Sequence, residues 1–244
     1  GADPTVELSS APTAELPREA GPQELRAAVL AALHPKLVRT INRGLQELHN
    51  HALNRVRRAP GRADLEALLP TEEQIGSLTE LADDLLDQAY RAGTRSASSL
   101  AGRTLPEPAA PRDLDADFFG ELVDRVHSGL AATLRTGLSA GEGRPSLSNR
   151  VGVVFGELKG PRAEELAASH LVHAYELGML DAWSAGGVTS RRWVLGKEPR
   201  CPEGRCRHND RTGALPIGQA FPSGHDVPPV HVGCTCTTLP SAES

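Results

Sequence analysis

CPEGRC (residues 201–206) and PPVHVGCTC (residues 228–236) together hold all four cysteines of the chain. Cys201 and Cys206 form the first pair, and Cys234 and Cys236 form the second, with His231 just before it. Two short clusters of thiol and imidazole groups can clamp one tetrahedral metal ion. Thiolates are soft ligands that favour zinc over magnesium or calcium, so the spacing predicts a structural zinc site.

Five side chains compete for the four positions of such a site. Either all four cysteines bind, or His231 replaces Cys234 or Cys236. Disulfides, or thiols that only pack, are the alternatives, although a Cys-x-Cys pair closes on itself only as a strained ring. Residues 196–240 contain few large apolar side chains, so we expect these loops to need a cross-link to hold one shape.

Composition predicts a mainly α-helical protein. Of 244 residues, 39% are hydrophobic but only 3% are aromatic, which is typical of helices with an aliphatic core. No apolar run is long enough to span a membrane and no secretory signal is visible, so we expect a soluble protein made in the cytoplasm, with no membrane partner. The formal net charge of -5 gives no overall argument for nucleic-acid binding. The chain does not begin with Met, which is compatible with release from a longer polypeptide.

Apolar residues at spacings of three and four predict long amphipathic helices over 22–59, 71–93 and 114–138. Pro35 should kink the first helix or start its second half, and Gly93 should end the second. Thr71 and Gln74 form a predicted capping box. We expect a flexible lead-in over 1–21, a helical docking region over 22–140, and a linker over 94–113 within it.

Two neighbouring stretches carry opposite charge. Residues 26–62 contain eight basic side chains against one acid, and residues 64–87 contain eight acids and no base. The basic run is either a surface for DNA or another partner, or one side of a pair of helices that lie together through complementary charge.

The C-terminal part, residues 141–240, has a different pattern. Helices are predicted near 147–158 and 161–184, followed by strands over 188–195 and 236–239, and a tail over 241–244. The expected fold class is therefore mainly α, with long amphipathic N-terminal helices and a small α+β C-terminal domain that contains a zinc-stapled loop region.

A local basic patch surrounds the first cysteine pair. It is a candidate phosphate-contacting surface, or else a solvated rim that lowers the pKa of the thiols. Its members are Arg191, Arg192, Lys197, Arg200, Arg205, Arg207 and Arg211.

The order of these C-terminal signals resembles the phage Mu protein F-like family, the minor head or head-morphogenesis proteins of tailed bacteriophages. The resemblance covers roughly residues 145–240. The first Cys pair is spaced wider than in the family, and Thr235 and Val232 replace the family's Arg and Pro. The matching positions are Trp193, Cys201, Cys206, Gly213, Pro228, Pro229, His231, Cys234 and Cys236.

The resemblance implies a minor head protein that binds the phage portal, with capsid or scaffold proteins nearby, and that contacts packaged double-stranded DNA without sequence preference. It implies a place in the virion, inside the capsid near the portal. Two other classes stay open: a zinc-ribbon module that binds nucleic acid or protein, and a zinc-dependent toxin or hydrolase. We expect no catalysis, because the sequence has no phosphate loop, His-Glu-x-x-His helix or nucleophile elbow.

Overall fold

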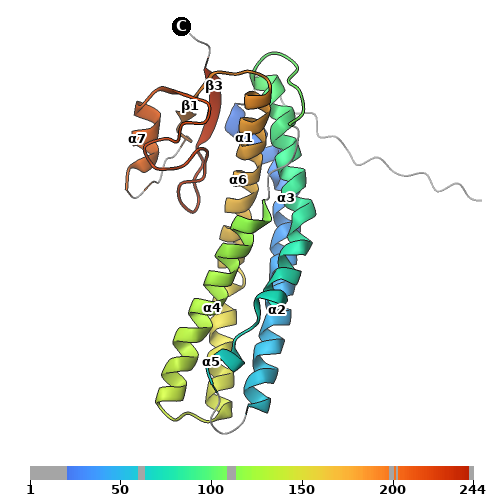
Figure 1. The fold of residues 1–244 in the computed structure, drawn as a ribbon, viewed down its shortest axis with the longest axis vertical. Helices are drawn as coiled ribbons and strands as arrows, with labels where there is room; N and C mark the ends of the chain where they lie inside the picture. Colours follow the sequence, from blue (N-terminus) through green and yellow to red (C-terminus); the bar gives the residue numbers. More distant parts are fainter. Residues whose placement is uncertain (1–20, 60–63, 109–113, 198–200, 202, 242–244) are drawn as a thin grey trace, which may run out of the picture.

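The computed structural model describes residues 21–59, 64–108, 114–197, 201 and 203–241, and only the backbone of 72, 77–79, 81 and 115–119. The predicted lead-in and tail lie almost wholly outside these residues. A long helical body carries a small cap, residues 190–241, beside one of its ends (Figure 1). The mainly α fold class with a small antiparallel sheet is confirmed. None of the described helices is long and apolar enough to cross a bilayer.

Six long helices and one 3-10 turn build the body. Their bounds are α1 Pro22–Ala31, α2 His34–Arg58, η1 Glu66–Leu68, α3 Glu72–Leu100, α4 Asp115–Ser139, α5 Arg144–Leu158 and α6 Pro161–Ala185.

Two predicted helix signals are confirmed. Pro35 lies in the first turn of α2, where its missing amide proton removes no helical hydrogen bond, and the chain breaks between α1 and α2 just before it. The Thr71 hydroxyl accepts a hydrogen bond from the amide of Gln74, and the Gln74 side chain accepts one from the amide of Thr71. The capping box marks the start of α3, which begins at Glu72, the residue after Thr71.

The prediction that Gly93 ends its helix is wrong, because α3 continues to Leu100. Gly93 instead lies where α3 crosses α6, and a Cβ atom there would be 1.9 Å from the carbonyl oxygen of Tyr175. Gly178 of α6 has the reciprocal role, since its Cβ would lie 2.1 Å from the carbonyl oxygen of Tyr90. The two glycines allow the helix backbones to touch, and α3 and α6 run side by side along the body (Figure 1).

One apolar core runs through the body from α1 to α6. It includes Ile41 of α2, Leu86 of α3, Leu130 of α4, Phe155 of α5 and Trp183 of α6, all of them buried. This core includes residues on both sides of residue 140, where the sequence pattern changes. The residues of α5 and α6 belong to the helical body because their apolar faces complete its interior.

The cap contains a three-stranded antiparallel sheet in the order β2-β1-β3. The strands are β1 Ser190–Val194, β2 Ala214–Pro216 and β3 Thr237–Ser241, and a short helix, α7 Arg205–Arg211, follows the first cysteine pair. Strands β1 and β3 match the predicted ones, whereas α7 and β2 were not predicted. The cap has its own small core of Trp193, Phe221, Val230 and three cysteines, which brings the thiols into its interior.

Candidate metal centre

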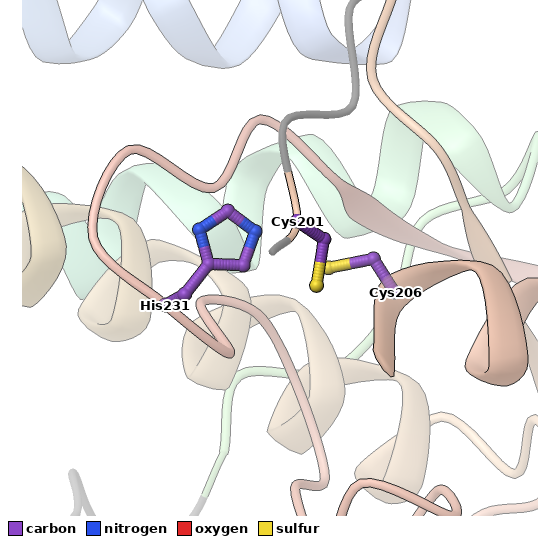
Figure 2. Close-up of side chains that lie close together, drawn as sticks. All are labelled: Cys201, Cys206 and His231. Atoms are coloured by element: carbon purple, nitrogen blue, oxygen red, sulfur yellow. The ribbon is translucent and has the colours of Figure 1, made fainter. Parts of the chain in front are cut away.

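The cysteines and His231 reach one place from three segments of the cap. Cys201 lies in the loop after β1, and Cys206 lies in the first turn of α7. His231 and Cys234 lie in the loop before β3, and Cys236 directly precedes that strand. In Figure 2 the sulfur atoms of Cys201 and Cys206 point toward one another, and the imidazole ring of His231 faces them.

The donor atoms form two overlapping triads. In one triad, those of Cys201, Cys206 and His231 all lie within 4.8 Å of one another; in the other, those of Cys206, Cys234 and Cys236 do so. Cys206 therefore belongs to both. All five predicted ligands are gathered here, whereas His208 and His225 belong to neither triad.

The spacing of the sulfur atoms suits a tetrahedral ion. The Sγ atoms of Cys206 and Cys234 are 3.8 Å apart. Metal–sulfur bonds of about 2.3 Å at the tetrahedral angle place two sulfurs about 3.8 Å apart. Each of the four cysteines is a free thiol. The residues present therefore fit a metal ion with soft ligands.

The three innermost thiols cannot all ionise together. The thiol of Cys234 donates a hydrogen bond that lowers the pKa of Cys236 to about 5. That hydrogen bond raises the pKa of Cys234, and burial adds to the effect. Burial, followed by the negative charge of Cys236, raises the pKa of Cys206 to about 12. A divalent cation would displace the remaining protons and offset most of the negative charge of the thiolates.

Backbone and indole N–H groups surround the sulfur of Cys236. The amide of Gly196 and the indole of Trp193 both help to lower the pKa of this thiol. The Nε1 of Trp193 is buried, and among the described residues it meets no partner with normal hydrogen-bond geometry, so its influence on Cys236 is its one polar interaction there. Gly196 is needed for the close approach, because a Cβ there would lie 1.9 Å from Oγ1 of Thr235. Such outer donors orient and stabilise metal-bound thiolates.

The outer side of the site is more exposed. Burial opposes ionisation of Cys201, but hydrogen bonds from Cys206 and from the amides of Glu203 and Arg205 lower its pKa. His231 Nδ1 lies 2.8 Å from the carbonyl oxygen of Val232. Because a carbonyl only accepts hydrogen bonds, Nδ1 carries the proton and Nε2 keeps the lone pair that a metal requires.

A buried charge network fastens the site to the helical body. Arg26 of α1 and Glu176 of α6 form an ion pair at 2.5 Å, with their side chains 6% and 0% exposed. The same Arg26 guanidinium donates to the carbonyl oxygens of Cys236 at 2.6 Å and Thr235 at 3.2 Å. These contacts run directly from α1 to the Cys-x-Cys segment.

Glu176 also holds the start of β3. Its carboxylate accepts hydrogen bonds from the hydroxyl of Thr237 at 2.6 Å, and from the amide at 3.0 Å and hydroxyl at 2.9 Å of Thr238. Sequence analysis missed Arg26 and Glu176 as site residues. One feature of the sequence could have indicated Glu176. It is an acid between Tyr175 and Leu177 in a largely apolar stretch of α6, and an acid that is buried there requires polar partners.

The predicted basic patch needs one correction. Arg191 is buried, and its guanidinium donates to the carbonyl oxygens of Pro216, Gln219 and Asp226, so it braces the cap and cannot meet a phosphate. Arg205 pairs with Glu203 at 2.8 Å, and Arg200 lies outside the described residues. The exposed members are Arg192, Lys197, Arg207 and Arg211.

Comparison of the chain with protein-family models, with curated proteins and with solved structures finds no match.

Proposed function

We propose that the five donors hold one structural zinc ion that staples the cap. The single observation that carries this proposal is the pair of donor triads that share Cys206. Five donors for four positions favour a closed site, whereas a catalytic zinc keeps one position for water. Four donors would be bound, and the fifth would lie beside them. We therefore propose a protein without catalytic activity.

We further propose that the protein is a minor head protein of a tailed phage that binds the portal or adjoining capsid and scaffold proteins inside the capsid. The residues that carry the family resemblance support this proposal. These residues come from several loops and strands within residues 193–236, and they meet in the cap. They are Trp193, Cys201, Cys206, His231, Cys234 and Cys236. The elongated helical body would reach the partner, since long helices offer extended contact surfaces.

Association with a portal ring tests the head-protein proposal. The wild-type chain is co-expressed with a tagged portal protein from the same gene cluster, and we expect it to remain bound through size-exclusion chromatography. The matched control is the same pull-down with an equally tagged host protein that has no part in the phage head. Absence of the chain from the portal fraction, together with its absence from purified particles by mass spectrometry, would refute a head function and favour a cellular zinc module.

The exposed bases of the cap offer a second test, on DNA contact. Replacing Arg207 and Arg211 by Gln should weaken binding to a mixed-sequence duplex, and binding by the wild type should fall steeply with added salt. The control is replacement of Arg135 of α4 and Arg162 of α6, which are exposed and lie outside the basic runs of α2 and the cap, by Gln. If DNA binding is absent or independent of salt, then the proposed DNA contact is wrong and only the protein partners remain proposed.

A further inference from the structure

The exposed face of α2 is basic over residues 36–43. Lys36, Arg39 and Arg43 follow one another at spacings of three and four residues, so they lie in one stripe over about two turns. Arg57 and Arg58 continue it near the end of the helix, and Glu47 is the one acid of α2. We call Lys36, Arg39 and Arg43 the basic stripe.

The exposed face of α3 is acidic over a similar length. Glu73, Glu80 and Asp84 are exposed, and their spacings of seven and four residues place them on one side of the helix. We call these three residues the acidic stripe. Asp87 continues it, but its carboxylate is paired with Arg91 of the same helix at 2.7 Å.

The two stripes do not neutralise each other within the chain. Helices α2 and α3 do pack together, as one of the two sequence interpretations expected, but through the apolar core. No ion pair among the described residues joins a base of α2 to an acid of α3. Arg55 reaches toward the start of α3, where it donates to the carbonyl oxygen of Leu69 and to the side-chain oxygen of Gln74.

We propose that a second copy of this chain is the partner of both stripes, with the basic stripe of one copy against the acidic stripe of the other. A second copy satisfies both faces at once. A nucleic acid would match only α2, and it would be repelled by the acids of the neighbouring α3 and by the net charge of -5. The inference rests on the charges of the helical body and is independent of the head-protein proposal.

Charge reversal tests the interface in full-length protein. One variant carries Lys36→Glu, Arg39→Glu and Arg43→Glu; the other carries Glu73→Lys, Glu80→Lys and Asp84→Lys. Sedimentation velocity at low salt should show wild-type association that weakens by about tenfold or more when salt screens the charges. Each variant alone should be monomeric, because like charges then face each other.

An equimolar mixture of the two variants should associate again, and so should a chain that carries all six reversals. A merely structural effect of the substitutions would not be reversed by mixing. Circular dichroism checks that each variant is folded. The matched control reverses Arg192, Arg207 and Arg211, which are exposed on the cap, and should associate like the wild type.

Two results would overturn the proposal. One is a wild-type chain that stays monomeric at low salt. The other is a mixture of the reversed variants that fails to associate although both are folded. Binding of the monomeric wild type to a DNA duplex, lost on reversal of the basic stripe alone, would assign that stripe to nucleic acid instead.

Discussion

Cys206 is the central residue of the candidate metal centre, because both donor triads include its sulfur. We expect purified wild-type protein to contain about one zinc per chain, and Cys206→Ser to contain almost none. Elemental analysis of protein purified without added metal measures this. His208→Ala is the matched control, since His208 is exposed in the same helix and belongs to neither triad. Wild-type protein without metal would contradict the zinc proposal.

A second residue-scale prediction concerns acid stability. A hydrogen bond with His170 at 2.8 Å, supported by Arg125, lowers the pKa of Glu121 from 4.5 to about 2. A carboxyl with a lowered pKa in the folded state stabilises the protein above its unfolded pKa, and this contribution is lost as the pH falls through the folded pKa.

The Glu121→Gln variant should therefore be less stable than wild type at neutral pH, and the difference should shrink as the pH falls from 4.5 to about 2. Urea unfolding midpoints at several pH values measure it. Partial exposure of the carboxylate screens the effect. Glu157→Gln, on an exposed position of α5, is the control. A difference that stays constant over this pH range would show that Glu121 does not titrate in this way.

At the scale of helices, the crossing of α3 and α6 depends on glycine. Gly93→Ala should lower the free energy of unfolding by about 2 kcal/mol or more, because the added methyl group would overlap the backbone of α6. Gly156→Ala in α5, where nothing lies within 4 Å, should instead raise it by up to about 1 kcal/mol through better helix propensity. Chemical denaturation of both variants compares them. Equal effects would argue against the close crossing.

The contact between α1, α6 and β3 depends on the buried ion pair. Arg26→Met should destabilise the protein by about 3–5 kcal/mol, because it leaves the fully buried carboxylate of Glu176 without its counter-charge. The double variant Arg26→Met with Glu176→Leu should lose less than the sum of the two single variants. Urea denaturation of all four proteins completes the cycle. Additive losses would show that the two groups act separately.

At the scale of the whole molecule, we expect metal removal to make the cap sensitive to protease but to leave the helical body resistant. A chelator should open residues 196–240 to trypsin, which can cut at the exposed Arg207 and Arg211, while the helical body stays resistant. The expectation follows because the cap has a small core of its own and the body has a continuous one. Mass spectrometry of the fragments locates the cuts. Simultaneous digestion of body and cap would contradict a locally stapled cap.

The sequence alone predicted most elements and the candidate ligands, because these predictions depend on local patterns. Apolar residues at helical spacing located α2 and α4. Pro35 marked the break before α2, Thr71 with Gln74 marked the start of α3, and start and stop signals located α6. Thiol and imidazole spacing singled out the five side chains that the structure gathers in two triads able to hold a metal ion. The metal's identity and the protein's partners remain predictions.

Only the tertiary structure decided how these parts meet. Gly93 was predicted to end a helix, but it lies where α3 and α6 cross. Arg191 was predicted to be a surface base, but it is buried and donates hydrogen bonds within the cap. The fold also paired Arg26 with Glu176, 150 residues away, beneath the Cys-x-Cys segment. The physical reason is that helix periodicity and ligand spacing act over a few residues. Whether a charged side chain is buried, or whether a glycine lets two helix backbones touch, depends on neighbours that only the folded chain supplies.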